Sequence, residues 1–490
     1  MVWILIFLLV SLSNALCSAT VSGLDALEVA VRKDLELINC PAEPWRDTGG
    51  PYDVVIIGGG MAGMSLGLAL LKQGITHIKI CDKSEKGLEG PWKTYARMNT
   101  LRSHKKFLGP ALTIPHLTFR AWYTAQFGNQ AWEKLDKAPT HLWADYLQWY
   151  KKVLNLPVEN NCQLQKIIPD NDLLRLQLKQ ADKQSEVVTH KVILATGRTG
   201  FGGFEIPSFM KSLPKSRYAH TGQIINPEYV QGKDVIIIGT GASAFDSAAF
   251  ALEHKARSVA LLMRRLELPL VTKGRYLDHP GGQQGFYNLS KKYRWEIFKH
   301  IFQAGTTTPL SSLARIKKYS NVKLYPRVSI RAIHEKNNRV EVVTDDRTFM
   351  ADYVILATGF AIDGTKQPEL EGIIDNVKLW QDMAEKPTSS VDQKLGRFPF
   401  LGPHFEFLEK TPGSAPYLKN IHCFNYAAAL THGLVSEDIS GIGVGAERLA
   451  QGIASDLFVE ESQKHLEGIK AFNTSELKNE SFSWLLTPKA

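Results

Sequence analysis

The sequence predicts an α/β fold that contains two parallel-sheet units, and two observations support this prediction. A β-branched run, Val54 to Ile57, leads into a glycine-rich turn and then into a helical pattern. The same order of elements recurs at Val235 to Ile238. Such runs are typical of strands that helices bury on both faces. The repeat therefore predicts two Rossmann-like units in one chain.

The composition of the 490-residue chain narrows the class of protein. It has 44% hydrophobic and 22% charged residues, as in an ordinary globular protein. The net charge is +9, but there is no long Lys/Arg block and no zinc-finger spacing, so we expect no nucleic-acid partner. A mean hydropathy of −0.15 excludes a polytopic membrane protein. The five cysteines include no CxxC pair, so we expect neither a local redox dithiol nor a metal site.

The N-terminus carries an unbroken apolar run, Val2 to Val10, that is too short to span a bilayer comfortably. The small residues Cys17 and Ala19 occupy the positions that a signal peptidase needs. We expect residues 1–19 to be a secretory signal peptide, which predicts a secretory-pathway, extracellular or periplasmic location. Because residues 1–24 contain no Lys or Arg, the alternatives are an uncleaved membrane anchor or a cytoplasmic protein. We expect no further integral membrane segment.

The first glycine-rich turn has the form GxGxxG, with glycines at Gly58, Gly60 and Gly63. The first glycine permits a tight turn, the second lets the backbone approach a pyrophosphate, and the third lets helix and strand pack. The next predicted strand ends at Asp82, where an acid binds ribose hydroxyls. This context predicts a dinucleotide site, with a purely structural glycine turn as the alternative.

The second turn has the form GxGxxA and contains Gly239, Gly241, Ser243 and Ala244. The strand that follows it ends in a pair of cations, Arg264-Arg265, in place of an acid. A cation at this place accommodates the 2′-phosphate of NADP, so we predict NADPH here. The alternative is that one or both arginines form a surface or helix-capping pair.

Two different dinucleotide sites in one chain constrain the chemistry. The first, which carries Asp82 and lies nearest the N-terminus, suits a tightly held FAD, whereas the second suits an exchangeable NADPH. Such a pair implies hydride transfer from nicotinamide to flavin. No pair of carboxylates and no Ser/His/Asp set stands out, so the sequence names no catalytic residue.

Five features of residues 51–460 together resemble the flavoprotein monooxygenases with two dinucleotide-binding domains, namely the flavin-containing, Baeyer–Villiger and N-hydroxylating enzymes. They are the first turn, Gly90-Pro91-Trp92, Ala195-Thr196-Gly197, the second turn with its Ser/Ala-rich helix, and Ala357-Thr358-Gly359-Phe360. The resemblance implies that Trp92, Thr196, Gly197 and Gly359 contact the cofactors. It also implies that NADPH reduces FAD, which then activates dioxygen to oxygenate a small organic substrate.

The resemblance further implies a discontinuous FAD-binding domain with the NADPH-binding domain inserted. The resemblance places the two parts of the FAD-binding domain at residues 51–212 and 346–460, the NADPH-binding domain at 213–345 and a C-terminal tail at 461–490. Residues 20–50 are expected to form an N-terminal amphipathic helix and a connector, because Leu24, Leu27, Val31 and Leu35 have helical spacing. Residues 425–445 would return to close over the flavin. Residues 280–285, Pro-Gly-Gly-Gln-Gln-Gly, are expected to form a mobile loop.

Two other functions stay open at this point. One is an NADPH–flavin oxidoreductase or oxidase that does not oxygenate a substrate. The other is a non-catalytic flavin- or NADPH-binding protein that acts through a partner.

Overall fold

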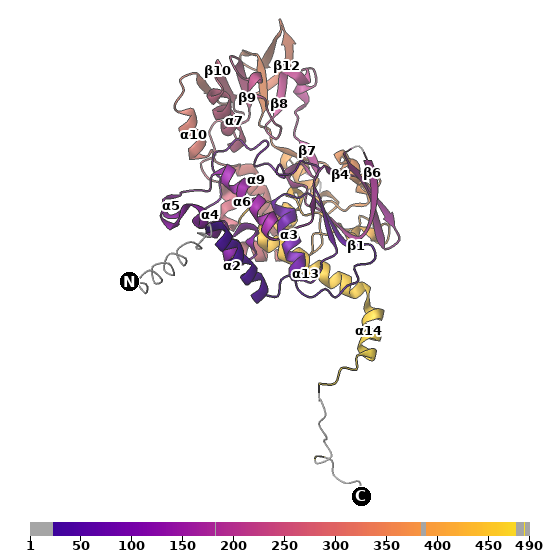
Figure 1. Ribbon diagram of the computed structural model, residues 1–490. Coiled ribbons are helices and arrows are strands. Elements are labelled where there is room, and N and C mark those ends of the chain that lie inside the picture. The colour runs from indigo at the N-terminus through magenta and orange to yellow at the C-terminus, as the bar shows by residue number, and fades with distance from the viewer. Residues whose placement is uncertain (1–22, 182, 384–388, 477–484, 486–490) are drawn as a thin grey trace, which may run out of the picture.

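The computed structural model describes residues 23–490 except 182, 384–388, 477–484 and 486–490. The predicted signal peptide, residues 1–19, therefore lies outside the described residues. Figure 1 shows two lobes, one with β8, β9, β10 and β12 and the other with β1, β4 and β6. Within the described ranges, no helix is long and apolar enough to cross a membrane.

The sheet of the first unit has the strand order β3-β2-β1-β6-β5-β4, with β17 also paired to β6. The bounds are β1 Tyr52–Ile57, β2 Ile78–Cys81, β3 Val158–Glu159, β4 Cys162–Asp170, β5 Leu173–Gln180, β6 Lys183–Leu194 and β17 Ile421–His422. Strand β6 pairs antiparallel with β5, and its last residues pair parallel with β1 and β17. Strands β4, β5 and β6, which lie between the two glycine turns in the sequence, therefore form an antiparallel part of the first sheet.

The sheet of the second unit is parallel throughout, in the order β11-β10-β9-β15-β8. The bounds are β8 Tyr218–His220, β9 Asp234–Ile238, β10 Ser258–Leu262, β11 Val322–Tyr325 and β15 Tyr353–Leu356. Residues of β9 alternate between two cores: Val235 and Ile237 belong to one, Ile236 and Ile238 to the other. Burial on both faces explains why this strand is a continuous apolar run.

Helices cover the sheets as the two repeated patterns predict. Their bounds are α2 Gly23–Leu37, α3 Met61–Lys72, α4 Phe119–Phe127, α5 Asn129–Lys134, α6 Thr140–Val153, α7 Ala242–Glu253, α8 Pro280–Gly285, α9 Lys291–Ala304, α10 Leu310–Ile316, α11 Ser390–Gly396, α12 Ala429–His432, α13 Ile442–Glu460 and α14 Ser462–Ala471. Helix α3 packs against α13 in the first unit, and α7 packs against α10 in the second. The predicted N-terminal amphipathic helix is confirmed as α2, which buries Leu27 and Val31.

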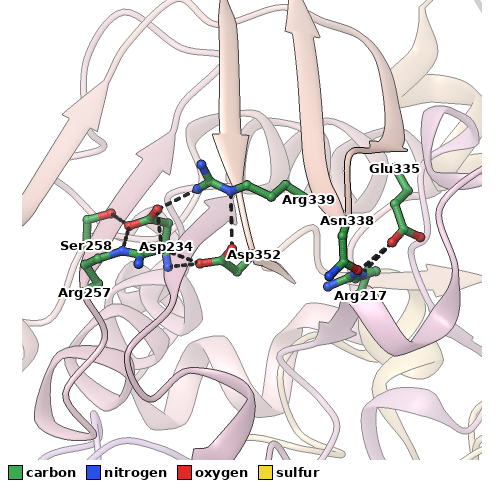
Figure 2. Close-up of polar contacts among 8 residues, drawn as sticks. All are labelled: Arg217, Asp234, Arg257, Ser258, Glu335, Asn338, Arg339 and Asp352. Atoms are coloured by element: carbon green, nitrogen blue, oxygen red, sulfur yellow. Dashed lines mark hydrogen bonds and ion pairs between the residues drawn. The ribbon is translucent and has the colours of Figure 1, made fainter.

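A three-stranded antiparallel sheet covers the other face of the second unit, with β12 Ile330–Lys336, β13 Arg339–Thr344 and β14 Thr348–Ala351. Figure 2 shows the ion pairs that fasten it at the amino ends of β9 and β15. Arg339 lies 2.6 Å from Asp234 and 3.3 Å from Asp352, and Arg257 bridges the same two carboxylates. Hydrogen bonding from Arg257 lowers the pKa of Asp234. These charges lie at the strand ends opposite the glycine turn, so they are structural.

Two strands connect the units, and they pair with each other. Strand β7, Gly202–Phe204, precedes the second unit, and β16, Phe360–Ile362, follows it; the two are antiparallel. Because β14 and β15 belong to the second unit, that unit continues to residue 356 and does not end at 345 as we expected. The sequence did not reveal where the second unit ends. The apolar run before Ala195 and the run before Ala357 have the same pattern, although they belong to different sheets.

Two segments between β10 and β11 also differ from expectation. Residues 280–285 form helix α8 and not a loop, because Pro280 begins the helix and His279 accepts a hydrogen bond from the Gly282 N–H. Helix α9 packs its Phe298 against Phe398 of the first unit, with ring centroids 5.6 Å apart. Residues within the predicted NADPH-binding domain thus contribute to the core of the first unit.

Candidate functional site

Two glycines of the first turn are required by the protein itself. Gly58 has φ +113°, and a Cβ there would lie 2.3 Å from the Ala195 carbonyl oxygen. A Cβ on Gly63 would lie 1.9 Å from the Gly58 carbonyl oxygen. These glycines hold the turn against strand β6 and against helix α3, so they shape the site without facing a ligand.

The middle glycines of the two turns are different. Gly60 and Gly241 have φ −74° and −72°, which any residue can adopt. A Cβ on Gly60 would meet only Gly90 atoms at 3.7 Å or beyond, and one on Gly241 would meet nothing within 4 Å. Neither residue caps its helix with a side chain, so the N–H groups of α3 and α7 stay free for an anion. The space at both positions fits a pyrophosphate.

The second turn repeats the first in its protein contacts. Gly239 has φ +114°, and a Cβ there would lie 2.4 Å from the Ala357 carbonyl oxygen. Ala244 is fully buried in the core of the second unit, so it packs helix against strand. Ser243 is exposed in the first turn of α7, where its side chain is accessible to a phosphate.

Each Ala-Thr-Gly tripeptide ends the strand next to its glycine turn. Gly197 has φ +69° and Gly359 has φ +87°, and a Cβ on either would meet nothing within 4 Å. Thr196 accepts a 3.1 Å hydrogen bond from the Asn425 side chain, which also donates to the Leu194 carbonyl. The segment that we expected to return to the flavin therefore reaches the carboxyl edge of the first sheet, where α/β folds bind ligands.

Asp82 and Trp92 lie on either side of the first turn. Asp82 is 7% exposed; its Oδ2 accepts the Gly59 N–H and its Oδ1 the Ser84 N–H, each at 2.7 Å. A carboxylate has further acceptor capacity, so these bonds orient it without saturating it. Trp92 packs edge-on to Trp143, and its indole N–H is buried without a hydrogen-bond partner among the described residues. An unpaired buried donor favours a polar ligand beside it.

The structure separates the two arginines of the predicted NADPH site. Arg265 donates to the carbonyls of Gln303 at 2.6 Å and Ala304 at 2.8 Å, so it caps the C-terminus of α9. This is the helix-capping alternative that the sequence left open. Arg264 is exposed. Contact of Arg264 with a 2′-phosphate stays a prediction.

Replacing Arg264 with alanine is expected to raise the KM for NADPH by roughly 10- to 100-fold, the effect of losing one charge-assisted hydrogen bond. The KM for NADH should not change, because NADH has no 2′-phosphate. The matched variant Arg265→Ala should instead lower the Tm with little change in either KM. Equal losses for the two coenzymes in Arg264→Ala would contradict the assignment.

The segment 95–102 joins the two units. Arg97 donates to the carbonyls of Thr221 at 2.9 Å and Gln223 at 2.6 Å, just after β8. Arg102 forms a 2.8 Å ion pair with Asp246 of α7, the helix that follows the second turn. These contacts hold the backbone after β8 and helix α7 of the second unit against the segment 95–102.

Comparisons with known proteins agree with this geometry. The pyridine nucleotide-disulphide oxidoreductase family model matches residues 55–273. A FAD-dependent urate hydroxylase from Xanthomonas campestris pv. campestris is 35% identical over 462 residues, covering 93% of this chain and 97% of that protein. The chain belongs to the flavoprotein monooxygenases with two dinucleotide-binding domains. It is an FAD-dependent oxidoreductase that uses NADPH and dioxygen to oxygenate a small molecule.

Solved structures of flavoprotein monooxygenases share the fold. Ornithine hydroxylase from Pseudomonas aeruginosa, in its reduced form, has a TM-score of 0.64 at 15% identity and covers 83% of this chain and 100% of its own. A flavin-containing monooxygenase from Stenotrophomonas maltophilia has a TM-score of 0.56 at 18% identity and covers 83% and 99%. These structures confirm the expected fold class. The expected cofactors, FAD and NADPH, are supported by the family match and by the FAD-dependent relative.

The structure also reveals charged residues that the sequence did not single out. Arg198 follows the first Ala-Thr-Gly and forms an ion pair with Glu437, whose carboxylate is almost fully buried. The ring of Tyr426 lies 5.7 Å below the Arg198 guanidinium. Arg198 and Glu437 are 239 positions apart in the sequence. Only the neighbouring residues, the Ala-Thr-Gly before Arg198 and the small residues around Glu437, indicated a site in the sequence. By contrast, Asn425, His432 and Ser436 are buried and satisfied by protein contacts.

Proposed function

We propose that this monooxygenase hydroxylates urate or a closely related oxidised purine. The observation that carries the proposal is the 35% identity to a urate hydroxylase, which extends over 97% of that protein. Urate is an anion at neutral pH, and four arginines gather near the junction of the two units: Arg97, Arg102, Arg198 and Arg275. Among these, the side chain of Arg198 is 49% exposed, so its guanidinium is accessible to a small anion.

The residues of the chain would bind, orient and shield the reactants. Gly60 and Gly241 would admit the two pyrophosphates, and the free N–H groups of α3 and α7 would hold them. Arg97 and Arg102 would keep the units at a fixed distance, which hydride transfer requires. Bound FAD would supply the two-electron redox chemistry of the reaction, with NADPH as the reductant and dioxygen as the oxidant.

The proposal is tested with purified FAD-loaded protein. Addition of urate should increase the rate of NADPH oxidation, urate should disappear in a one-to-one ratio with NADPH, and ¹⁸O₂ should label the product with one atom. Ornithine and lysine serve as control substrates of another chemical class. Faster NADPH oxidation with either amine and none with urate would refute the substrate proposal. Hydrogen peroxide as the sole product with urate would favour the oxidase alternative.

We also propose that the protein enters the secretory pathway through residues 1–19. The apolar run and the small residues at positions 17 and 19 support this proposal. N-terminal sequencing of the protein from its native cells should find a chain that begins at Thr20. A chain that begins at Met1 would contradict cleavage.

A further inference from the structure

A bidentate ion pair lies where the two units meet. The Arg198 Nε is 2.8 Å from Glu437 Oε2, and its Nη2 is 3.1 Å from Glu437 Oε1. The Glu437 side chain is 7% exposed, whereas that of Arg198 is 49% exposed. Arg198 therefore holds the buried Glu437 carboxylate in place, and the Arg198 guanidinium is itself accessible to a ligand.

Residues from both units surround this pair. From the first unit, Tyr95 and Tyr426 interact with both charged partners, and Asp438 follows Glu437 in the chain. From the second unit, Arg275 and Asp278 approach Asp438, and Asp278 accepts a hydrogen bond from Ser440. The remaining charged neighbour of Asp438 is Arg102, in the junction segment 95–102.

The pair lies beside the carboxyl edge of the first sheet and beside the segment 95–102. Tyr95 is two residues from Arg97, which binds the backbone just after β8 of the second unit. Arg198 directly follows Gly197 at the carboxyl edge of the first sheet. The pair is thus bordered by the first unit's ligand-binding edge on one side and by the second unit on the other.

The protonation behaviour of Glu437 suits proton transfer. An arginine at this distance alone would lower the pKa of a carboxyl group. Burial nevertheless raises the pKa of Glu437 to about 7, and the negative charge of Asp438 adds to the increase. A carboxyl group with a pKa near the working pH can both accept and release a proton.

We propose that Glu437 accepts the proton that the substrate loses when it is oxygenated, and that Arg198 binds the substrate's anionic face. A ring N–H bond of urate breaks, its proton goes to the Glu437 carboxylate, and its electron pair moves into the ring. The adjacent ring carbon forms a bond to one atom of dioxygen, which becomes a hydroxyl group, while the O–O bond breaks and the other atom leaves as water. NADPH supplies the two electrons as a hydride, solvent supplies two protons, and Glu437 then returns the urate proton to solvent, so that one proton is consumed in the overall reaction. This inference rests on the proposed function.

The variant Glu437→Gln separates proton transfer from packing, because glutamine keeps the size and a hydrogen bond to Arg198 but accepts no proton. We expect kcat with urate to fall by about 100-fold, while NADPH reduces the flavin at an unchanged rate. In the wild type, kcat should rise with pH through about 7 as Glu437 ionises. The variant should lack this rise, and Glu437→Asp should restore part of kcat.

A binding measurement provides a readout besides turnover. Calorimetry of urate binding to the oxidised holoenzyme near neutral pH, in two buffers of different ionisation enthalpy, counts the protons exchanged. The wild type should take up a fraction of a proton, because a bound anion raises the pKa of a neighbouring carboxyl group. Glu437→Gln should take up none. The control is Glu335→Gln, which removes a carboxylate of β12 that is paired with Arg217 at the amino end of β8, and it should match the wild type.

Each outcome decides the question. The inference is wrong if the Glu437→Gln variant has the same kcat, the same pH profile and the same proton uptake as the wild type. Equal losses in Glu437→Gln and Glu437→Asp, accompanied by a lower Tm in both, would also overturn it in favour of a purely structural ion pair. If the wild type itself neither binds nor oxidises urate, the proposed function fails and this inference fails with it.

Discussion

Replacing Gly241 with alanine is expected to leave the fold and the FAD content unchanged and to slow flavin reduction by NADPH about 100-fold. The added methyl group would meet no protein atom within 4 Å, and the backbone at this position is ordinary for alanine. It would, however, occupy the space over the α7 N-terminus that we assign to the pyrophosphate of NADPH. Stopped-flow measurement of flavin bleaching at limiting NADPH tests this expectation.

The matched variant is Gly239→Ala in the same turn. Its methyl group would lie 2.4 Å from the Ala357 carbonyl oxygen, at a φ of +114°. This variant should therefore lower the Tm as well as the rate, whereas Gly241→Ala should lower the rate alone. A wild-type reduction rate in Gly241→Ala would show that NADPH does not bind over this turn.

Replacing Gly60 with alanine is expected to give a folded but colourless protein that lacks FAD and has no monooxygenase activity. The methyl group would make ordinary contacts of 3.7 Å with Gly90, so the protein tolerates it. The FAD pyrophosphate needs the same space, and we expect its Kd to rise by at least about 100-fold. Flavin absorbance after gel filtration measures the loss directly.

Thermal denaturation supplies the control for Gly60→Ala. With FAD removed, the variant and the wild type should unfold at the same temperature. Added FAD should raise the Tm of the wild type only, since a ligand stabilises the state that binds it. Gly241→Ala should respond to FAD as the wild type does. Retention of a full complement of FAD by Gly60→Ala would contradict the assigned position of the first cofactor.

The local elements of the fold could be predicted from the sequence, because they depend on neighbouring residues. The apolar run, the glycine turn and the helix that follows form one βαβ unit, and its signals lie within about 30 residues. The cofactor pair followed from the acid at Asp82 and the arginines at the corresponding place of the second unit. The structure adds the local geometry: a Cβ on Gly58 or Gly239 would clash with a backbone carbonyl, whereas a Cβ on Gly60 or Gly241 would meet no atom closer than 3.7 Å.

Contacts between distant segments could not be predicted in this way. The role of Arg265 depends on where α9 ends, which the sequence near Arg265 does not encode. Likewise, Cys81 and Cys162 have no motif spacing, yet both are buried in the core of the first unit. The Arg198–Glu437 pair is the functional example, because the charges come together only when the C-terminal segment returns to the first sheet. Such pairs require knowledge of the topology.

The pairing of β7 with β16 has a consequence for how this architecture can vary. The chain leaves the first unit through Gly203 and comes back opposite it at Ala361, so the intervening polypeptide starts and finishes at one place. An insertion with adjoining ends disturbs its host no more than a long surface loop does. The coenzyme-binding sheet can therefore diverge between homologues as one inserted unit, provided that α9 keeps its contact with the core of the first unit.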